Sequence, residues 1–142
     1  MKHPITDTVK KAYDLAVTTR EKAYAPYSKF KVGSAVKPTG SDTLFSGCNV
    51  ENSSYPGTLC AERTSVVKMI SELSENQIEF VVLVTDNDPT VFPCGFCLQV
   101  LSEFATTDTI VYASNLEGIH RSFLFSELLP NTFDKSQLPD AN

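Results

Sequence analysis

The sequence predicts an α/β protein of three layers, in which helices cover both faces of a mixed sheet of about five strands. Two observations carry this prediction: an early hairpin of two strand-like runs, and strand-like and helical runs that alternate after it. A hairpin pairs its strands antiparallel, whereas strands joined through a helix pair in parallel, so the sheet should be mixed. A chain of 142 residues has the size of one domain, so we expect residues 1–142 to form a single domain.

The first half of the chain predicts one helix and one hairpin. Apolar residues recur at helical spacing over 5–24, and Thr6 or Asp7 is placed to cap the helix start. The runs 30–38 and 43–50 are strand-like, and the turn-forming sequence PTGSD joins them.

The second half predicts alternating strands and helices, and the polar ends of the chain, 1–4 and 134–142, should be loose. One strand is a nearly continuous apolar run, so it should be covered on both faces. The elements are a helix over 58–73, this apolar strand over 78–86, a helix over 94–105, strands over 108–114 and 118–123, and a short helix over 124–130.

Two of these helices carry cysteines at their starts and have an apolar stripe that should face the sheet. The stripes comprise Ala61, Val66, Val67 and Ile70 in the first helix, and Phe96, Val100, Leu101 and Phe104 in the second.

Composition and charge exclude several classes of partner. The net charge is −5, and Lys and Arg form no cluster larger than a pair, so a nucleic-acid partner is not expected. No apolar run is long enough to span a membrane, and the N-terminus does not have the pattern of a signal peptide. We therefore expect a cytoplasmic protein with no membrane partner, whose four cysteines stay reduced.

The cysteines predict a metal site. Cys94 and Cys97 are three residues apart and would face the same way on one helical turn, and Cys60 would open another helix. The partial positive charge at a helix start favours the thiolate form. Two such helix starts facing each other would bring three thiolates to one ion and leave a fourth position open, as in a catalytic zinc site. Glu62 would then reach a water at that position.

Spacing alone leaves other interpretations of these cysteines open. Cys-x-x-Cys also occurs in redox dithiols, in halves of structural zinc sites and in hydrophobic cores. A structural zinc needs a fourth ligand, and Cys48 is the only other cysteine, which we expect to be a buried strand residue. His3 and His120 are isolated, and such histidines mostly satisfy local hydrogen bonds.

Several motifs together resemble the zinc-dependent deaminases of nucleobases, which share the CAE and PCxxC sequences seen here. AYAPYSKFKVGSAV, GCNVENSSY, CAERT, PCGFCLQ and LLPNTF are similar in order and spacing to the short, three-cysteine cytidine deaminases. The resemblance runs from about Ala12 to Phe133. It implies hydrolytic deamination of cytidine and deoxycytidine to uridine and deoxyuridine with release of ammonia, in pyrimidine salvage.

The resemblance also implies a role for each matching residue. One zinc ion per chain would be held by Cys60, Cys94 and Cys97, Glu62 would move protons between water and the base, and Arg63 would hydrogen-bond the ligand sulfurs. The remaining residues would bind the substrate. They are Phe30, Asn49, Glu51, Tyr55, Ala61 and Phe133.

Among these, Asn49 and Glu51 would grip the 3′-hydroxyl of the sugar, and Glu51 would repel a phosphate there, which favours a free nucleoside. In the family, residues equivalent to Tyr55 and Phe133 reach the active site of a neighbouring subunit, which implies a homotetramer with shared active sites.

Two positions depart from the family pattern. Leu98 replaces an arginine, and Phe96 is bulkier than the small or polar residue usual between the cysteines. These departures keep a relative that acts on a modified cytosine nucleoside as an alternative. A zinc-stabilised binding module without turnover is a further alternative, but it has no use for Glu62. A deaminase of polynucleotides is disfavoured by the net charge of −5 and by Glu51.

Overall fold

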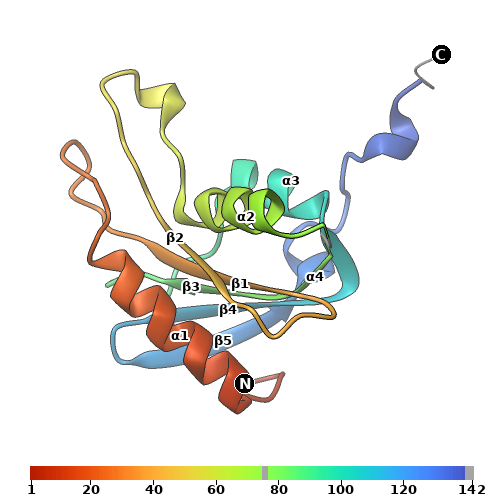
Figure 1. Ribbon diagram of the computed structural model, residues 1–142, viewed down its shortest axis with the longest axis horizontal. Helices are drawn as coiled ribbons and strands as arrows, with labels where there is room; N and C mark the ends of the chain where they lie inside the picture. The colour runs from red at the N-terminus through yellow and green to blue at the C-terminus, as the bar shows by residue number, and fades with distance from the viewer. Residues whose placement is uncertain (75–76, 140–142) are drawn as a thin grey trace.

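The computed structural model describes residues 1–74 and 77–139. Its centre is a five-stranded sheet in the order β2-β1-β3-β4-β5 (Figure 1). The strands span Gly33–Pro38 (β1), Phe45–Cys48 (β2), Ile78–Val84 (β3), Ala105–Asn115 (β4) and Gly118–Leu124 (β5).

The sheet is mixed, as the sequence predicts. β1 pairs antiparallel with both β2 and β3, and β4 pairs antiparallel with β5. β3 and β4 pair in parallel, and the chain between them contains a helix. The parallel pair therefore arises where a helix separates two strands, and the antiparallel pairs include the two hairpins.

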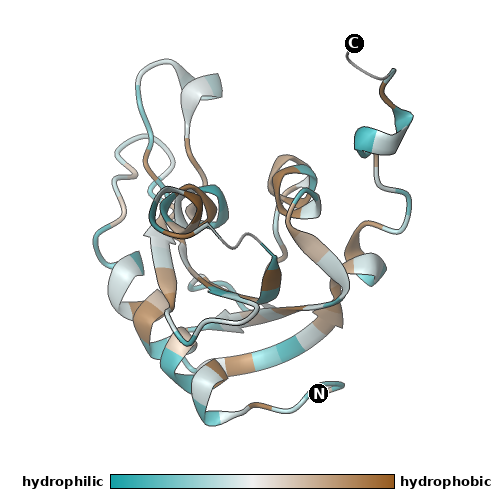
Figure 2. Cartoon of the chain, turned by 45° about the vertical axis from the view of Figure 1, so that its right-hand side comes forward, coloured by the Kyte–Doolittle hydropathy of each residue, from teal (hydrophilic) through white to brown (hydrophobic). Residues whose placement is uncertain are grey.

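Helices cover both faces of the sheet, which confirms the three layers. α1 (Asp7–Arg20) lies on one face, and α2 (Ala61–Glu72), α3 (Gly95–Ser102) and α4 (Phe125–Leu128) lie on the other (Figure 1). Hydrophobic segments run through the strands and the helices packed on them (Figure 2).

Two hydrophobic clusters fill the spaces between these layers. The α1 side is built around Ala12, Ala16 and Tyr112, and the opposite side around Met69, Leu101 and Val111. β3 contributes to both clusters, so the expectation that this strand is covered on both faces is confirmed.

The packing of α2 on the sheet requires a glycine at position 47. A Cβ atom added to Gly47 would lie 2.4 Å from the Ser65 nitrogen and 2.6 Å from the Ala61 carbonyl oxygen. The first turn of α2 therefore lies directly against β2, and this contact sets the height of the helix start above the sheet.

Some predicted details are wrong. α1 ends at Arg20 and not at residue 24, because Arg20 turns inward and Tyr24 forms an isolated β-bridge with Val50. Val67 and Ile70 are exposed, and Met69 takes the buried place on α2. The α2 stripe is thus rotated by one to two residues from the predicted one.

Residues near both ends of the chain make contacts or form regular structure. Lys2 pairs with Glu127, and the His3 backbone nitrogen donates to the Ser122 hydroxyl at 3.1 Å. Near the other end, a 3-10 helix spans Lys135–Gln137, and the expected loose residues 140–142 lie outside the described part of the chain.

Candidate metal centre and active site

The three cysteines lie at the starts of two helices, as predicted. Cys60 is the N-cap of α2 and Cys94 is the N-cap of α3, with Cys97 in the first turn of α3. Both N-cap residues have extended backbone angles, and neither side chain makes a capping hydrogen bond. Their sulfurs are therefore left for another use.

These sulfurs form a group of the size that a zinc ion requires. The Sγ atoms of Cys60, Cys94 and Cys97 all lie within 4.8 Å of one another. In a tetrahedral site with zinc–sulfur distances of about 2.3 Å, the sulfurs are about 3.8 Å apart. Thiolates favour zinc over hard cations such as Mg²⁺ or Ca²⁺. The donor set thus fits one zinc ion per chain.

The other cysteine and the histidines are used elsewhere. Cys48 is half-buried in β2, which is less buried than expected, because β2 is an edge strand. The Nδ1 atom of His3 lies 3.2 Å from the Ser122 hydroxyl, and the Nε2 atom of His120 lies 2.8 Å from Asn115 Oδ1. Within residues 1–74 and 77–139, the metal-type group contains neither histidine.

The cysteine group favours one thiolate before any ion is bound. A hydrogen bond from the Cys97 thiol, helped by Arg63, lowers the pKa of Cys60 to about 5. The same hydrogen bond and burial raise the pKa of Cys97. A negative sulfur at Cys60 is therefore already stabilised where a cation would bind.

Glu62 is a buried carboxylic acid beside this group. It lies in the first turn of α2, and only 4% of its surface is exposed. Burial raises the pKa of Glu62 to about 7, and the Cys60 thiolate acts in the same direction. Such a carboxyl group can both accept and donate a proton near neutral pH.

Glu62 borders a small cavity at the carboxyl end of β3, with a volume of about 140 Å³. The walls are mostly apolar. They comprise Phe30, Val32, Cys60, Glu62, Leu83, Thr85, Val91, Phe92 and Cys94. The structure thus brings Phe30, Glu62 and two of the cysteines to one cavity. The sequence did not single out Val32, Leu83, Thr85, Val91 and Phe92, because neither apolar residues nor a lone threonine in strands and loops signal a pocket.

Ala61 and the two sugar-binding candidates lie outside the cavity lining. Ala61 is completely buried at the first position of α2. Asn49 fixes the segment before β1: its Oδ1 accepts from the Val32 nitrogen at 2.9 Å, and its Nδ2 donates to the Phe30 carbonyl at 2.8 Å.

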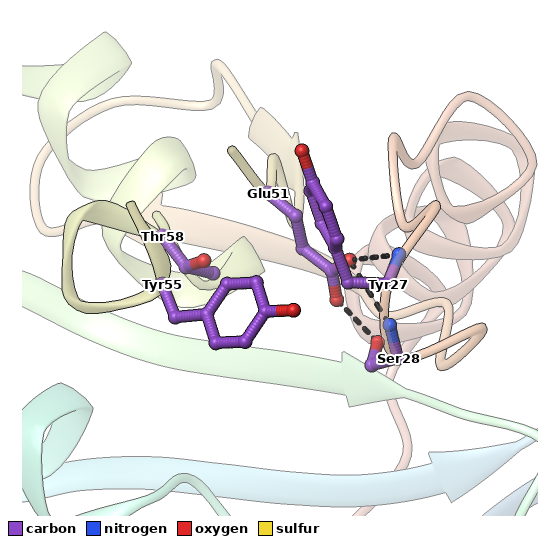
Figure 3. Close-up of a pocket in the computed structure, with 5 residues that line it drawn as sticks. All are labelled: Tyr27, Ser28, Glu51, Tyr55 and Thr58. Atoms are coloured by element: carbon purple, nitrogen blue, oxygen red, sulfur yellow. Dashed lines mark hydrogen bonds between the residues drawn. The ribbon is translucent and has the colours of Figure 1, made fainter. Parts of the chain in front are cut away.

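Glu51 holds the start of the same segment, at Tyr27 and Ser28 (Figure 3). Its Oε2 atom accepts from the backbone nitrogens of Tyr27 at 2.9 Å and Ser28 at 3.2 Å, and its Oε1 atom accepts from the Ser28 hydroxyl. The Ser28 hydroxyl bond, followed by the backbone bonds, holds the pKa of Glu51 below its usual value. Sequence reasoning missed this role of Ser28, although the residue lies in the APYSKF motif.

Tyr55 and Phe133 are exposed and lie outside the lining of the cavity in their own chain. Tyr55 is 67% exposed on the loop before α2, where its ring lies 5.2 Å from that of Tyr27 (Figure 3). Phe133 is 55% exposed in the segment after α4, which Gln99 ties to α3 through a 2.7 Å bond to the Phe133 carbonyl. Neither ring lines the cavity beside Glu62.

Arg63 lies against the metal group. Its Nη2 atom donates to the Thr58 carbonyl and lies 3.9 Å from Cys60 Sγ. The Arg63 guanidinium is therefore close to one of the three sulfurs, that of Cys60.

Residues 6–114 match the family described as the cytidine and deoxycytidylate deaminase zinc-binding region. The chain belongs to this family. It is 42% identical over 119 residues to a cytidine deaminase of Sporosarcina psychrophila, covering 84% of this chain and 86% of the relative. A cytidine deaminase of Halalkalibacterium halodurans is 41% identical over 125 residues, with 88% and 93% covered.

A solved structure agrees with this assignment. The crystal structure of cytidine deaminase from Burkholderia pseudomallei superposes with a TM-score of 0.81 at 36% identity, covering 87% of this chain and 98% of that one. The predicted family, fold class and zinc-binding character are therefore confirmed.

The two departures from the family pattern have separate structural settings. Leu98 is half-buried and packs against the hydrophobic cluster under α2 and α3, so it extends the core. Phe96 is 63% exposed, so the prediction that it faces the sheet is wrong.

No helix in the described residues is long and apolar enough to cross a membrane.

Proposed function

We propose that this protein is a cytidine deaminase that converts cytidine and deoxycytidine to uridine and deoxyuridine by hydrolysis, with release of ammonia. The observation that carries the proposal is the buried Glu62 carboxyl group beside three clustered cysteine sulfurs, at the edge of an apolar cavity. A structural zinc site has no need of a buried acid with a raised pKa.

Cys60, Cys94 and Cys97 would hold the zinc ion, with Arg63 supporting the Cys60 sulfur. When bound, zinc supplies Lewis acidity that makes water nucleophilic near neutral pH. Three thiolates reduce this acidity, and the guanidinium of Arg63 withdraws part of their charge.

Glu62 would move the protons of the reaction. With a pKa of about 7, its carboxylate takes a proton from the attacking water and returns it to N3 of the cytosine ring. The carboxylate then takes the remaining proton from the hydroxyl group now on C4 and passes it to the departing amine, so that the C4 carbonyl forms as ammonia leaves and one side chain acts twice. The apolar wall of Phe30 and its neighbours excludes bulk water and seats the base.

The substrate is proposed to be a free nucleoside. Glu51 is a carboxylate with a lowered pKa, so it stays ionised near neutral pH and accepts a hydrogen bond from a sugar hydroxyl. A phosphate at that position would face a like charge. Asn49 and Glu51 would bind the sugar with the hydrogen-bonding capacity that remains after they hold residues 27–32.

We further propose a homotetramer in which Tyr55 and Phe133 reach neighbouring active sites. Both rings are more than half exposed and lie outside the cavity of their own chain. Aromatic side chains are enriched in the interfaces between protein chains, which supports this proposal. The reduced thiols that the site needs fit a cytoplasmic location.

The test is ultraviolet absorbance of the purified protein with cytidine, deoxycytidine, dCMP and the 3′-phosphate of deoxycytidine, with zinc counted in the same samples. We expect both nucleosides to be converted, with about one zinc per chain. The 3′-phosphate of deoxycytidine, which would face Glu51, should react far more slowly than dCMP, whose phosphate is on the 5′ oxygen. Glu62→Gln should retain zinc and lose nearly all turnover.

Bound zinc without conversion of either nucleoside would contradict the proposed substrate and favour a modified cytosine nucleoside. Absence of zinc from protein prepared under reducing conditions would overturn the metal site itself. Light scattering of the same sample measures the mass of the particle, and a monomer that is fully active would refute shared active sites.

A further inference from the structure

Phe96 makes one specific contact despite its exposure. The Cζ atom of Arg63 lies 4.4 Å from the centre of the Phe96 ring, which is the geometry of a cation–π pair. Arg63 is on α2 and Phe96 is on α3, one residue before Cys97. The pair therefore joins the two helix starts that carry the cysteines.

The polar contacts of Arg63 do not by themselves fix its guanidinium. Both polar contacts, to Thr58 and to Cys60, are made through Nη2. The Nε atom is buried and has no hydrogen-bond partner among the described residues. A planar group held at one nitrogen can still tilt about that point, whereas a ring stacked on its face opposes the tilt.

We propose that Phe96 is a positioning residue, whose ring holds the Arg63 guanidinium against the Cys60 sulfur and so slows the loss of zinc. The proposal rests on the zinc site of the proposed function and adds a residue to it. The proposal gives a role to an exposed phenylalanine that directly precedes Cys97 in the sequence.

The size of the effect follows from the geometry. An exposed cation–π pair is worth enough to change an equilibrium or a rate by about two- to fivefold. Leucine at position 96 keeps most of the apolar bulk but has no π face, whereas tyrosine keeps the ring. The expected order of zinc retention is therefore wild type, then Phe96→Tyr close to it, then Phe96→Leu.

The experiment measures the rate at which zinc-loaded protein releases its metal to an excess of a coloured chelator. We expect Phe96→Leu to release zinc about two- to fivefold faster than the wild type, and Phe96→Tyr to restore the wild-type rate. In an Arg63→Gln background, Phe96→Leu should change the rate no further, because Phe96 acts only through Arg63.

Leu116→Ala is the control. Leu116 is 47% exposed in the turn between β4 and β5, and it neither lines the cavity beside Glu62 nor stacks on Arg63. This variant should release zinc at the wild-type rate. The melting temperature of each metal-free variant should be equal, which separates zinc retention from general stability.

The outcomes distinguish this inference from the proposed function. A wild-type protein that binds no zinc overturns both. A wild type that binds zinc and deaminates cytidine, together with Phe96→Leu that releases zinc at the wild-type rate, overturns only the role of Phe96. An equal acceleration by Phe96→Leu with and without Arg63 would also overturn it.

Discussion

Replacement of Gly47 by alanine should damage the active site through a backbone contact. The added methyl group would lie 2.4 Å from the Ser65 nitrogen and 2.6 Å from the Ala61 carbonyl oxygen. Ordinary contact needs 3.4 Å, so the first turn of α2 and strand β2 would have to separate by about 1 Å. Both neighbours are backbone atoms, so no side chain can rotate away.

The displacement should affect stability and turnover differently. Overpacking of this kind costs about 1–3 kcal/mol of the free energy of unfolding. Glu62 lies in the displaced turn, and a misplacement of about 1 Å at a catalytic group can reduce turnover by about 10²-fold. We therefore expect Gly47→Ala to fold with a melting temperature several degrees lower and to lose most of its activity on cytidine.

Gly95→Ala is the matched control for this prediction. Gly95 lies between Cys94 and Phe96, closer in sequence to the metal ligands, yet a Cβ atom there meets nothing within 4 Å. This variant should keep wild-type stability, zinc content and turnover. The reasoning is refuted if Gly47→Ala is fully active, or if Gly95→Ala is damaged as much.

Three further predictions concern the core, the sugar site and pH. Met69→Ala should destabilise the fold by about 2–5 kcal/mol in chemical denaturation, because Met69 is completely buried, whereas Lys68→Ala on the exposed face should change little. Ser28→Ala should raise KM for cytidine roughly tenfold with kcat nearly unchanged, because the Ser28 hydroxyl holds Glu51; an equal loss in kcat would contradict a binding role. Zinc affinity, measured by competition with a chelator, should fall on acidification by about tenfold per pH unit for each proton displaced. The affinity falls with acidification, and does not rise, because the Cys97 thiol must lose its proton to bind zinc. Its hydrogen bond to Cys60 raises the pKa of Cys97, so protons compete strongly with zinc for this sulfur. An affinity that is constant over the acid range would exclude the thiols as ligands.

The placement of the cysteines at helix starts could be predicted from the sequence because a helix start depends on local structure. A helix start is marked by a change from loop residues to an apolar repeat, and the cysteines stand at that change. Cys60 and Cys94 are both N-caps in the structure, and Cys97 follows in the first turn. Spacing along the chain then places the sulfurs of Cys94 and Cys97 together without any knowledge of the fold.

The burial of individual side chains was less predictable. Val67 and Ile70 fit a helical repeat as well as Met69 does, and the choice between them depends on how α2 is rotated over the sheet. Phe96 fits the α3 repeat, but its ring is exposed and lies against Arg63 of another helix. Such rotations and cation–π pairs are set by residues distant in sequence, so a local pattern cannot reveal them.

The interactions of Asn49 and Glu51 show the same limit. Their side chains hold a segment about twenty residues earlier, and the partners are mostly backbone groups, which every residue possesses. Because backbone donors have no sequence signature, only the folded chain shows which of them these side chains contact.

The two cysteine N-caps also lower the local stability of the helix starts at this site as long as no cation is bound. α1 begins with Thr6, whose hydroxyl accepts a 3.3 Å bond from the Val9 nitrogen. α2 and α3 begin without such a bond, and a missing cap typically costs about 1 kcal/mol. The uncapped N–H groups leave positive ends of two helix dipoles directed at the sulfurs, where they favour thiolates. Local stability is thus lower at the two points where the cysteines must be ionised, and a cation bound only by the folded chain would restore it.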